Sequence, residues 1–283
     1  MGISSVKSWG GGHAFKLKMK SHFSPENSLK VSKLKVSNYS QLISIENIFQ
    51  AWEEFKKGKR NKYDVQVFER NLEDNLFDLH LELKSKTYRH GSYQDFYVND
   101  PKRRHIHKAE VADRIVHHLL YKYLYGLFDD TFIFDSYSCR LEKGTHKAVT
   151  RLEKFARIVS KNYTQDCWAL KCDIKKFFAS VDHEILKKLI SEKVKDSEIL
   201  RLVNQVIESF QSTRAQPMLG LNPDKGIPLG NVSSQIFANI YLNELDQFIK
   251  HKLKAEYLGH FSHTADPQSV NTFKNSVFLT LIN

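Results

Sequence analysis

A short apolar segment that ends in a carboxylate constrains the fold of this chain more than any other feature. The segment, CWALKCDI at residues 167–174, is bounded by polar residues and has the length of a strand, which predicts one buried β-strand. Asp173 lies at its end, and VDHEILKKL follows, where Asp182 is placed to cap a helix. Because ligands bind beyond the carboxyl ends of strands in many sheets, Asp173 is a candidate site residue.

The other periodic segments are mostly helical. Apolar residues recur at helical spacing from about Ser44 onward, and they predict helices in ISIENIFQAWEEFKKGK, DVQVFERNLEDNLFDLHLEL, AEVADRIVHHLLYKYLYGLF, THKAVTRLEKFARIVSK and SSQIFANIYLNELDQFIKHKL. Thr145 is the expected N-cap of the fourth. KTYRHGSYQDFYVNDPKRRHIHK has alternating aromatic residues and a turn at residues 99–101, which predicts a two-stranded hairpin with a basic end. This order predicts an α+β protein whose modest sheet is covered by helices.

The charge balance bears on the kind of partner. Lys and Arg number 43 against 32 Asp and Glu, which gives a net charge of +11. Clustered basic side chains release counterions from nucleic acid. Two interpretations of the charge are therefore equally favoured, which are a polyanionic partner and a basic face that only contacts solvent. No apolar run approaches the ~20 residues that span a bilayer, and the basic, glycine-rich start lacks a signal-peptide core. We expect a soluble, cytoplasmic protein without a membrane partner.

Cysteine and histidine give no metal pattern. The three cysteines are odd in number and match no zinc spacing, which favours a reducing compartment. The 13 histidines are scattered, and an ordinary surface or core role is expected for each, including His117 and His118.

A second motif, KGIPLGNVSSQIFANIYL at residues 225–242, is a loop shaped by Gly226, Pro228 and Gly230 that opens a helix. A helix N-terminus offers free N–H groups to a phosphate or a base edge, and Gln235 could reach the same ligand. Carboxylate oxygens suit Mg²⁺ together with substrate phosphates. By itself, however, a strand-end aspartate such as Asp173 is more often a cap or an ion-pair partner.

Together these segments resemble the bacterial reverse transcriptases, the RNA-directed DNA polymerases of retrons and group II introns. CDIKKFFASVDHEIL is similar to their motif A, and GIPLGNVSSQIFANIYLNELDQFIK is similar to their motif B. RRHIHKAEVADRIVHHLLY and FDDTFIFDSYSCRLEKGTHKAV resemble their fingers region. Four blocks in the family's order make the resemblance specific, and it implies a helix-rich right-hand polymerase with fingers and a partial palm.

The resemblance also implies residue roles. Asp173 would be the catalytic motif A carboxylate and a metal ligand, and Phe178 would favour dNTP over rNTP by crowding the sugar. The other implied contacts are with the nucleotide, for Arg104, Gly230 and Gln235, and with nucleic acid, for Arg103 and Arg114. The implied cofactor is Mg²⁺, with Mn²⁺ as a substitute, and the implied partners are an RNA template, a DNA or RNA primer and dNTP. Without the resemblance, Arg103 and Arg104 would be a solvated hairpin tip.

The sequence departs from the family after motif B. Motif C, a Tyr-x-Asp-Asp turn on a hairpin, is missing, and residues 263–266 read His-Thr-Ala-Asp at the expected distance. In that register Ala265 replaces the first aspartate, and Asp266 is the one carboxylate left to substitute. The polar residues that follow predict no strand, and the 17 residues after Asp266 (283 − 266) are too few for a thumb.

Four regions follow from this comparison. They are a loosely structured segment (1–38), a helical region (39–87), reverse transcriptase fingers and palm (88–254), and an atypical tail in place of motif C and thumb (255–283). The sequence therefore predicts an RNA-directed DNA polymerase by family, truncated before motif C and impaired in catalysis. The alternatives are a non-catalytic, nucleic-acid-binding remnant and an unstable product without function.

Structural rather than catalytic roles are expected for several other polar residues. Asp182 reads as a helix cap, and Asp129 and Asp130 begin a loop. Asp113 and Asp246 read as surface or ion-pair residues. If the strand persisted beyond Asp173, only one of the adjoining residues Phe177 and Phe178 could face the core.

Overall fold

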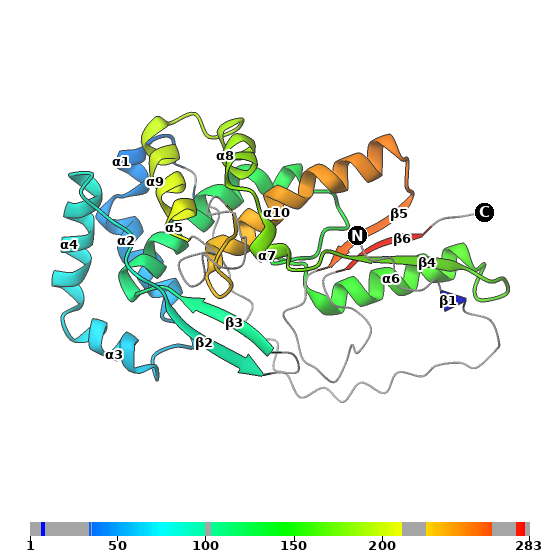
Figure 1. Ribbon diagram of the computed structural model, residues 1–283, viewed down its shortest axis with the longest axis horizontal. Coiled ribbons are helices and arrows are strands. Elements are labelled where there is room, and N and C mark those ends of the chain that lie inside the picture. Colours follow the sequence, from blue (N-terminus) through cyan, green and yellow to red (C-terminus); the bar gives the residue numbers. More distant parts are fainter. Residues whose placement is uncertain are drawn as a thin grey trace, which may run out of the picture. The chain divides into compact units, whose positions relative to one another are not determined.

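The chain forms two compact units, each built from segments that are distant in the sequence. The computed structural model describes residues 7–8, 34, 36–99, 103–210, 225–261 and 276–280 (Figure 1). One unit, here the helical unit, comprises Val31–Asp130 and Phe177–Tyr241. The other, the sheet unit, comprises Met1–Lys30, Thr131–Lys176 and Leu242–Asn283.

The helical unit is built around one long buried helix. Its helices are α1 (Tyr39–Leu42), α2 (Ile45–Phe55), α3 (Tyr63–Arg70), α4 (Leu72–Lys84), α5 (Val111–Phe128), α7 (Phe177–Ser180), α8 (His183–Ser191), α9 (Ser197–Glu208) and the first part of α10 (Val232–Gln247). A 3-10 turn, Asp129–Thr131, follows α5. Helix α5 is buried nearly all round because α2, α3 and α4 pack against it (Figure 1). The core between α2 and α5 contains Trp52, Phe55, Ile115 and Leu119, all almost fully buried.

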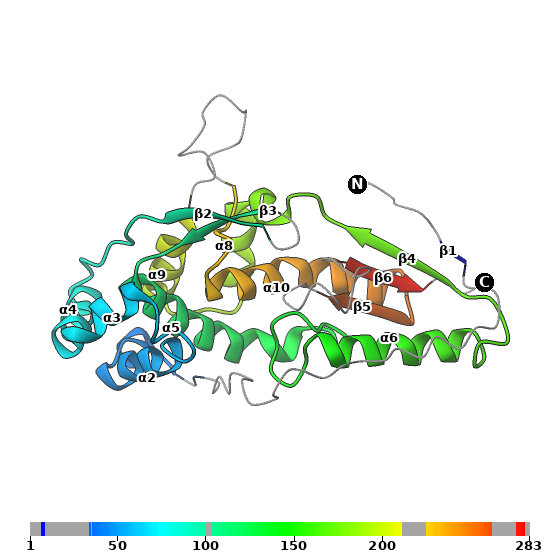
Figure 2. The ribbon, with the colours of Figure 1, turned by 90° about the horizontal axis from the view of Figure 1, so that it is seen from below.

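The predicted basic hairpin is confirmed. Strands β2 (Gln94–Asn99) and β3 (Arg103–Lys108) pair antiparallel, with Asp95 opposite His107 and Asn99 opposite Arg103. Figures 1 and 2 show this pair as a twisted ribbon at one side of the helices. Burial along β2 is low at every position, so that strand presents one exposed edge of the helical unit.

The sheet unit carries a four-stranded sheet in the order β1, β4, β6, β5. These strands are β1 (Lys7–Ser8), β4 (Trp168–Asp173), β5 (Tyr257–Phe261) and β6 (Ser276–Thr280), and each pairs antiparallel with its neighbours. Helix α6 (Thr145–Val159) runs along the sheet beside β5, where Phe155 meets Tyr257 edge to face (Figure 2). Among the described residues of this unit, Ile133, Ile249 and Leu258 form one buried apolar cluster.

The strands of the tail correct one prediction. No strand was expected in residues 267–276, but β6 begins at Ser276, the last of them, and pairs with both β4 and β5. The apolar run Val277-Phe278-Leu279 supplies it, and it lies beyond the polar residues on which the prediction rested. Asp266 itself, with residues 263–267, lies outside the described residues.

Helix ends were predicted with mixed success. Ser44 caps α2 by accepting a hydrogen bond from Asn47 N, and Asp182 caps α8 by accepting from Glu184 N and Ile185 N, as predicted for Asp182. Thr145 is not the cap of α6. Gly144 takes that position with φ of 102°, and Thr145 is the first helical residue.

Two further segments differ from expectation. The predicted helix over residues 64–83 is divided at Asn71 into α3 and α4. The strand β4 ends at Asp173, and Phe177 and Phe178 lie in the helical turn α7, where both are half-buried. The strand does not persist beyond Asp173, so the alternation expected of Phe177 and Phe178 in a continued strand does not apply to them.

Within the described residues, no helix is long and apolar enough to cross a membrane.

Candidate functional site

The glycine loop before α10 fits closely against the basic hairpin. Gly230 has φ of 122°, and a Cβ added to it would lie 2.8 Å from Ile106 Cγ2 on β3. His107 N donates to Leu229 O (2.8 Å), and Asn231 Nδ2 donates to His107 O (2.8 Å). The loop therefore requires glycine at position 230 for both its conformation and its close approach to β3.

The same loop is hydrogen-bonded to the segment around α7. Ile227 N donates to Phe178 O, and Gly226 N donates to Val181 O, both at 2.7 Å. His183 Nε2 donates to Gly226 O (2.6 Å), which orients its imidazole at the start of α8. The loop thus joins the segment that carries Phe178 to the hairpin that carries Arg104, all within the helical unit.

A buried polar chain holds the first turn of α10 in place. His117 on α5 and Ser233 are both fully buried and hydrogen-bond through Nδ1 and Oγ. His117 Nε2 lies 3.0 Å from His90 Nε2, and His90 Nδ1 donates to Gly91 O. Burial holds the pKa of His117 well below its usual value, and any positive charge on the nearby His90, His118 or Arg114 lowers it further. A neutral His117 that donates from Nε2 and accepts from Ser233 satisfies this chain.

The three predicted arginines lie in different surroundings. Arg104 on β3 is half-buried, and among the described residues its side chain has no hydrogen bond or ion pair. Arg103 is exposed, and its guanidinium lies 4.0 Å from the ring centre of Tyr97. Arg114 is committed internally, because it pairs with Asp64 and lies over the ring of Phe55.

The predicted metal ligand lies in the other unit. Asp173 ends β4, in register with Ser276, the first residue of β6. Ser276 also pairs with Phe261, the last residue of β5. The two strand ends that flank residues 262–275 are thus in register with Asp173. Gln235 lies half-buried in the first turn of α10, in the helical unit. Three of the predicted site residues, Arg104, Phe178 and Gly230, lie on segments that the backbone hydrogen bonds described above connect to one another.

Two carboxylates that were predicted to be surface or ion-pair residues are buried. Asp113 on α5 is 3% exposed and accepts hydrogen bonds from Tyr88 OH (2.6 Å) and Gly91 N (3.1 Å). Asp246 on α10 is 2% exposed. The surface alternative is therefore wrong for both, whereas the ion-pair alternative stands for Asp113, whose Oδ2 lies 3.7 Å from His90 Nδ1. For Asp113 the reason is that helical periodicity alone does not show that α5 is enclosed on nearly all sides.

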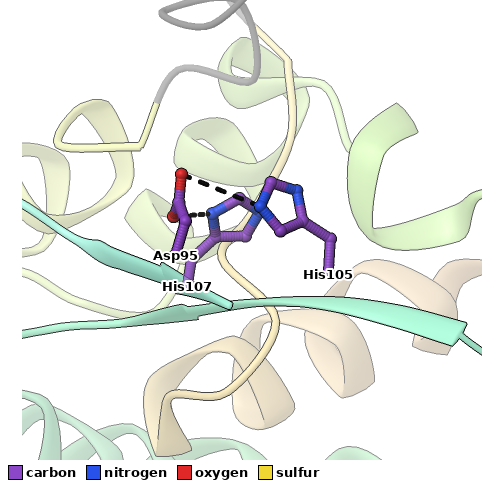
Figure 3. Close-up of side chains that lie close together, drawn as sticks. All are labelled: Asp95, His105 and His107. Atoms are coloured by element: carbon purple, nitrogen blue, oxygen red, sulfur yellow. Dashed lines mark hydrogen bonds and ion pairs between the residues drawn. The ribbon is translucent and has the colours of Figure 1, made fainter. Parts of the chain in front are cut away.

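Sequence reasoning missed a histidine cluster on the hairpin. Asp95, His105 and His107 place one ligand atom each within 4.8 Å of one another (Figure 3). The signal was present in the sequence, because His105 and His107 are two residues apart on a predicted strand and so share a face. The hairpin register, which sets Asp95 opposite His107, could not be read from the sequence.

Comparison with known proteins identifies the family. Residues 98–265 match the family model described as reverse transcriptase (RNA-dependent DNA polymerase). An uncharacterized 91 kDa protein in the cob intron of Schizosaccharomyces pombe is 30% identical over 51% of this chain and 17% of its own length. The group II intron-encoded protein LtrA of Lactococcus lactis subsp. cremoris is 25% identical over 59% of this chain and 27% of its own length.

A solved structure also matches most of this chain. It is titled as a partial Cas6-RT-Cas1–Cas2 complex, and it matches 84% of this chain and 37% of its own with a TM-score of 0.42 and 19% identity. A likeness of that size supports no conclusion. The chain spans only about a sixth to a quarter of the length of the curated relatives above. Because the family model covers more than half of the 283 residues, the chain belongs to the reverse transcriptase family.

Proposed function

We propose that this protein is an RNA-directed DNA polymerase that adds dNTPs to a primer on an RNA template. The family match carries the proposal, because residues 98–265 contain Arg104, Asp173, Phe178, Gly230 and Gln235 together. In this proposal the fingers and palm lie in residues 88–254, which belong partly to each of the two units. A net charge of +11 suits a nucleic-acid partner.

The chemistry of this reaction depends on positioning and charge. The primer 3′-oxygen attacks the α-phosphate of the dNTP, and pyrophosphate leaves, without a protein nucleophile. Arg104 is proposed to bind the triphosphate, and its lack of an internal partner among the described residues supports this role. Phe178 is proposed to exclude the ribose 2′-hydroxyl, and its backbone bond to Ile227 would hold it against the glycine loop.

The proposed cofactor is Mg²⁺, with Mn²⁺ as a substitute. A carboxylate at the end of β4 is a hard oxygen ligand of the kind Mg²⁺ prefers, and Asp173 is the proposed ligand. When bound, the ion would neutralise phosphate charge. Asp266, which lies outside the described residues, is proposed as a second carboxylate because it stands at about the distance from motif B that is expected of motif C.

The other arginines are proposed to bind nucleic acid less directly. Arg103 is exposed at the hairpin end, beside the ring of Tyr97, and it suits a backbone phosphate or a stacked base. Arg114 already neutralises Asp64, so template binding by Arg114 would require that ion pair to open. We therefore propose that the main role of Arg114 is structural, as the partner of Asp64.

The departures of the tail from motif C favour a second candidate, a nucleic-acid-binding protein without polymerase activity. The two candidates differ in one assay, which is primer extension by this chain on poly(rA) primed with oligo(dT). The polymerase predicts Mg²⁺-dependent dTTP incorporation well above that of Asp173→Ala. Incorporation equal to that of Asp173→Ala, with RNA binding that weakens steeply as salt rises, would support the second candidate and contradict the first.

A further inference from the structure

One face of the basic hairpin brings together three metal-ligand side chains. Asp95 on β2 lies directly opposite His107 on β3, and His105 follows on the same face two residues away. Figure 3 shows the carboxylate and both imidazoles turned toward one another above the strands. His107 Nδ1 lies 2.6 Å from Asp95 Oδ1, and His105 Nε2 lies 3.7 Å from Asp95 Oδ2.

These distances are near those of a formed metal site. Zinc–nitrogen bonds of about 2.0–2.1 Å in a tetrahedron set ligand atoms roughly 3.3 Å apart. The three ligand atoms here lie within 4.8 Å of one another, so small side-chain rotations would bring them to that spacing. The backbone needs no change, because the strand register already places all three residues on one face.

Neighbouring rings hold the imidazoles in orientation. His105 stacks on Tyr97, with ring centres 4.5 Å apart and planes 11° apart. Phe210 meets the ring of His107 at 4.7 Å. The backbone of His107 is fixed on both sides by its bonds to Leu229 O and Asn231 Nδ2. Such outer contacts orient ligands and reduce the cost of assembling a metal site.

The ligand types identify the class of metal. Two imidazoles and one carboxylate suit borderline divalent transition metals such as Zn²⁺, Co²⁺ and Ni²⁺, whereas Mg²⁺ prefers oxygen ligands alone. We propose that Asp95, His105 and His107 bind one Zn²⁺-class ion that links β2 to β3 and leaves at least one coordination position open. The proposal does not rest on polymerase activity, and its residues are distinct from Asp173.

Metal titration of the full chain tests this site. The protein is stripped with EDTA, and Zn²⁺ binding is measured by calorimetry in excess Mg²⁺. Co²⁺ serves as a second probe, because its visible absorption reports the ligands bound. The chain contains 13 histidines, so matched controls are His146→Ala on α6 and His251→Ala, both exposed and outside the cluster.

The expected result is one Zn²⁺ per chain that excess Mg²⁺ does not displace. His105→Ala and Asp95→Asn should weaken binding at least about tenfold and remove the Co²⁺ band, since ligand loss exceeds the usual effect of outer contacts. Both controls should bind as the unaltered chain does. Zn²⁺ should also slow amide exchange across residues 94–108 in the unaltered chain but not in Asp95→Asn, which retains a side chain of the same shape.

Three results would overturn the proposal. They are no saturable binding at one equivalent per chain, displacement of Zn²⁺ by Mg²⁺, and equal binding by His105→Ala and His146→Ala. Melting curves recorded in EDTA show whether each variant is folded. If His105→Ala is not folded, the Zn²⁺ affinity of Asp95→Asn alone decides whether the proposal stands.

Discussion

Replacing Gly230 with alanine should destabilise the helical unit by two separable effects. A non-glycine residue held at φ of 122° is strained, which costs about 1–3 kcal/mol. The new Cβ would also lie 2.8 Å from Ile106 Cγ2, and such overpacking costs about 1–3 kcal/mol. The free energy of unfolding should therefore fall by roughly 2–6 kcal/mol.

Gly58→Ala is the matched control, because Gly58 lies in the same unit as Gly230 and has a positive φ of 70° but nothing within 4 Å of the added Cβ. It should show the conformational cost alone, about 1–3 kcal/mol. Urea unfolding followed by tryptophan fluorescence measures both, and Trp52 reports on the helical unit. In a double-mutant cycle, Ile106→Ala should recover part of the stability that Gly230→Ala loses, because it removes Ile106 Cγ2, the atom with which the new Cβ clashes.

Two results would refute this reasoning about the loop. One is a Gly230→Ala chain no less stable than Gly58→Ala, which would mean that the loop and β3 are not in close contact. The other is zero coupling between Gly230→Ala and Ile106→Ala, which would place the lost stability somewhere other than that contact. Primer extension by Gly230→Ala should fall together with stability if the loop positions the nucleotide.

Other predictions follow from buried and paired charges. Lys122 and Glu54 form a buried ion pair at 2.9 Å, so Glu54→Ala should cost about 3–5 kcal/mol in urea unfolding, whereas joint replacement by leucine and methionine should be near neutral. Burial raises the pKa of Asp64, but hydrogen bonds from Lys108 and Arg114 outweigh it, and the net pKa is lowered. Asp64 therefore contributes stability above its unfolded pKa that is lost as pH falls through its folded pKa. Melting temperatures should show a shallower acid decline in Asp64→Asn, and an unchanged decline would refute this assignment.

Local chemistry predicted the hairpin, the capping role of Asp182 and most helices. The Asn99-to-Pro101 turn and the alternation around it are short-range signals, and no distant segment overrides them. The same holds for Asp182, whose side chain needs only the next two or three N–H groups. The resemblance to reverse transcriptases also came from the sequence and is confirmed by the family match.

Features that depend on distant segments were not predictable. Strand β6 becomes part of the sheet by pairing with β4, about a hundred residues earlier, and a short apolar run by itself does not specify that. The burial of Asp113 depends on Tyr88 and on the elements around α5. The cluster at Asp95 needed the register of β2 on β3. The catalytic role of Asp173 and the nucleotide contacts of Phe178 and Gln235 are proposals that rest on the family.

RNA-templated dTTP incorporation by Asp173→Asn and Asp182→Asn, compared with the unaltered chain at equal RNA occupancy, tests the polymerase function most directly. Asp182→Asn is the control, because asparagine also caps a helix and Asp182 caps α8. We predict Mg²⁺-dependent incorporation by the unaltered chain and by Asp182→Asn, and its loss in Asp173→Asn with RNA binding retained. Equal incorporation by Asp173→Asn and the unaltered chain, or none by any of the three, would contradict the proposed function.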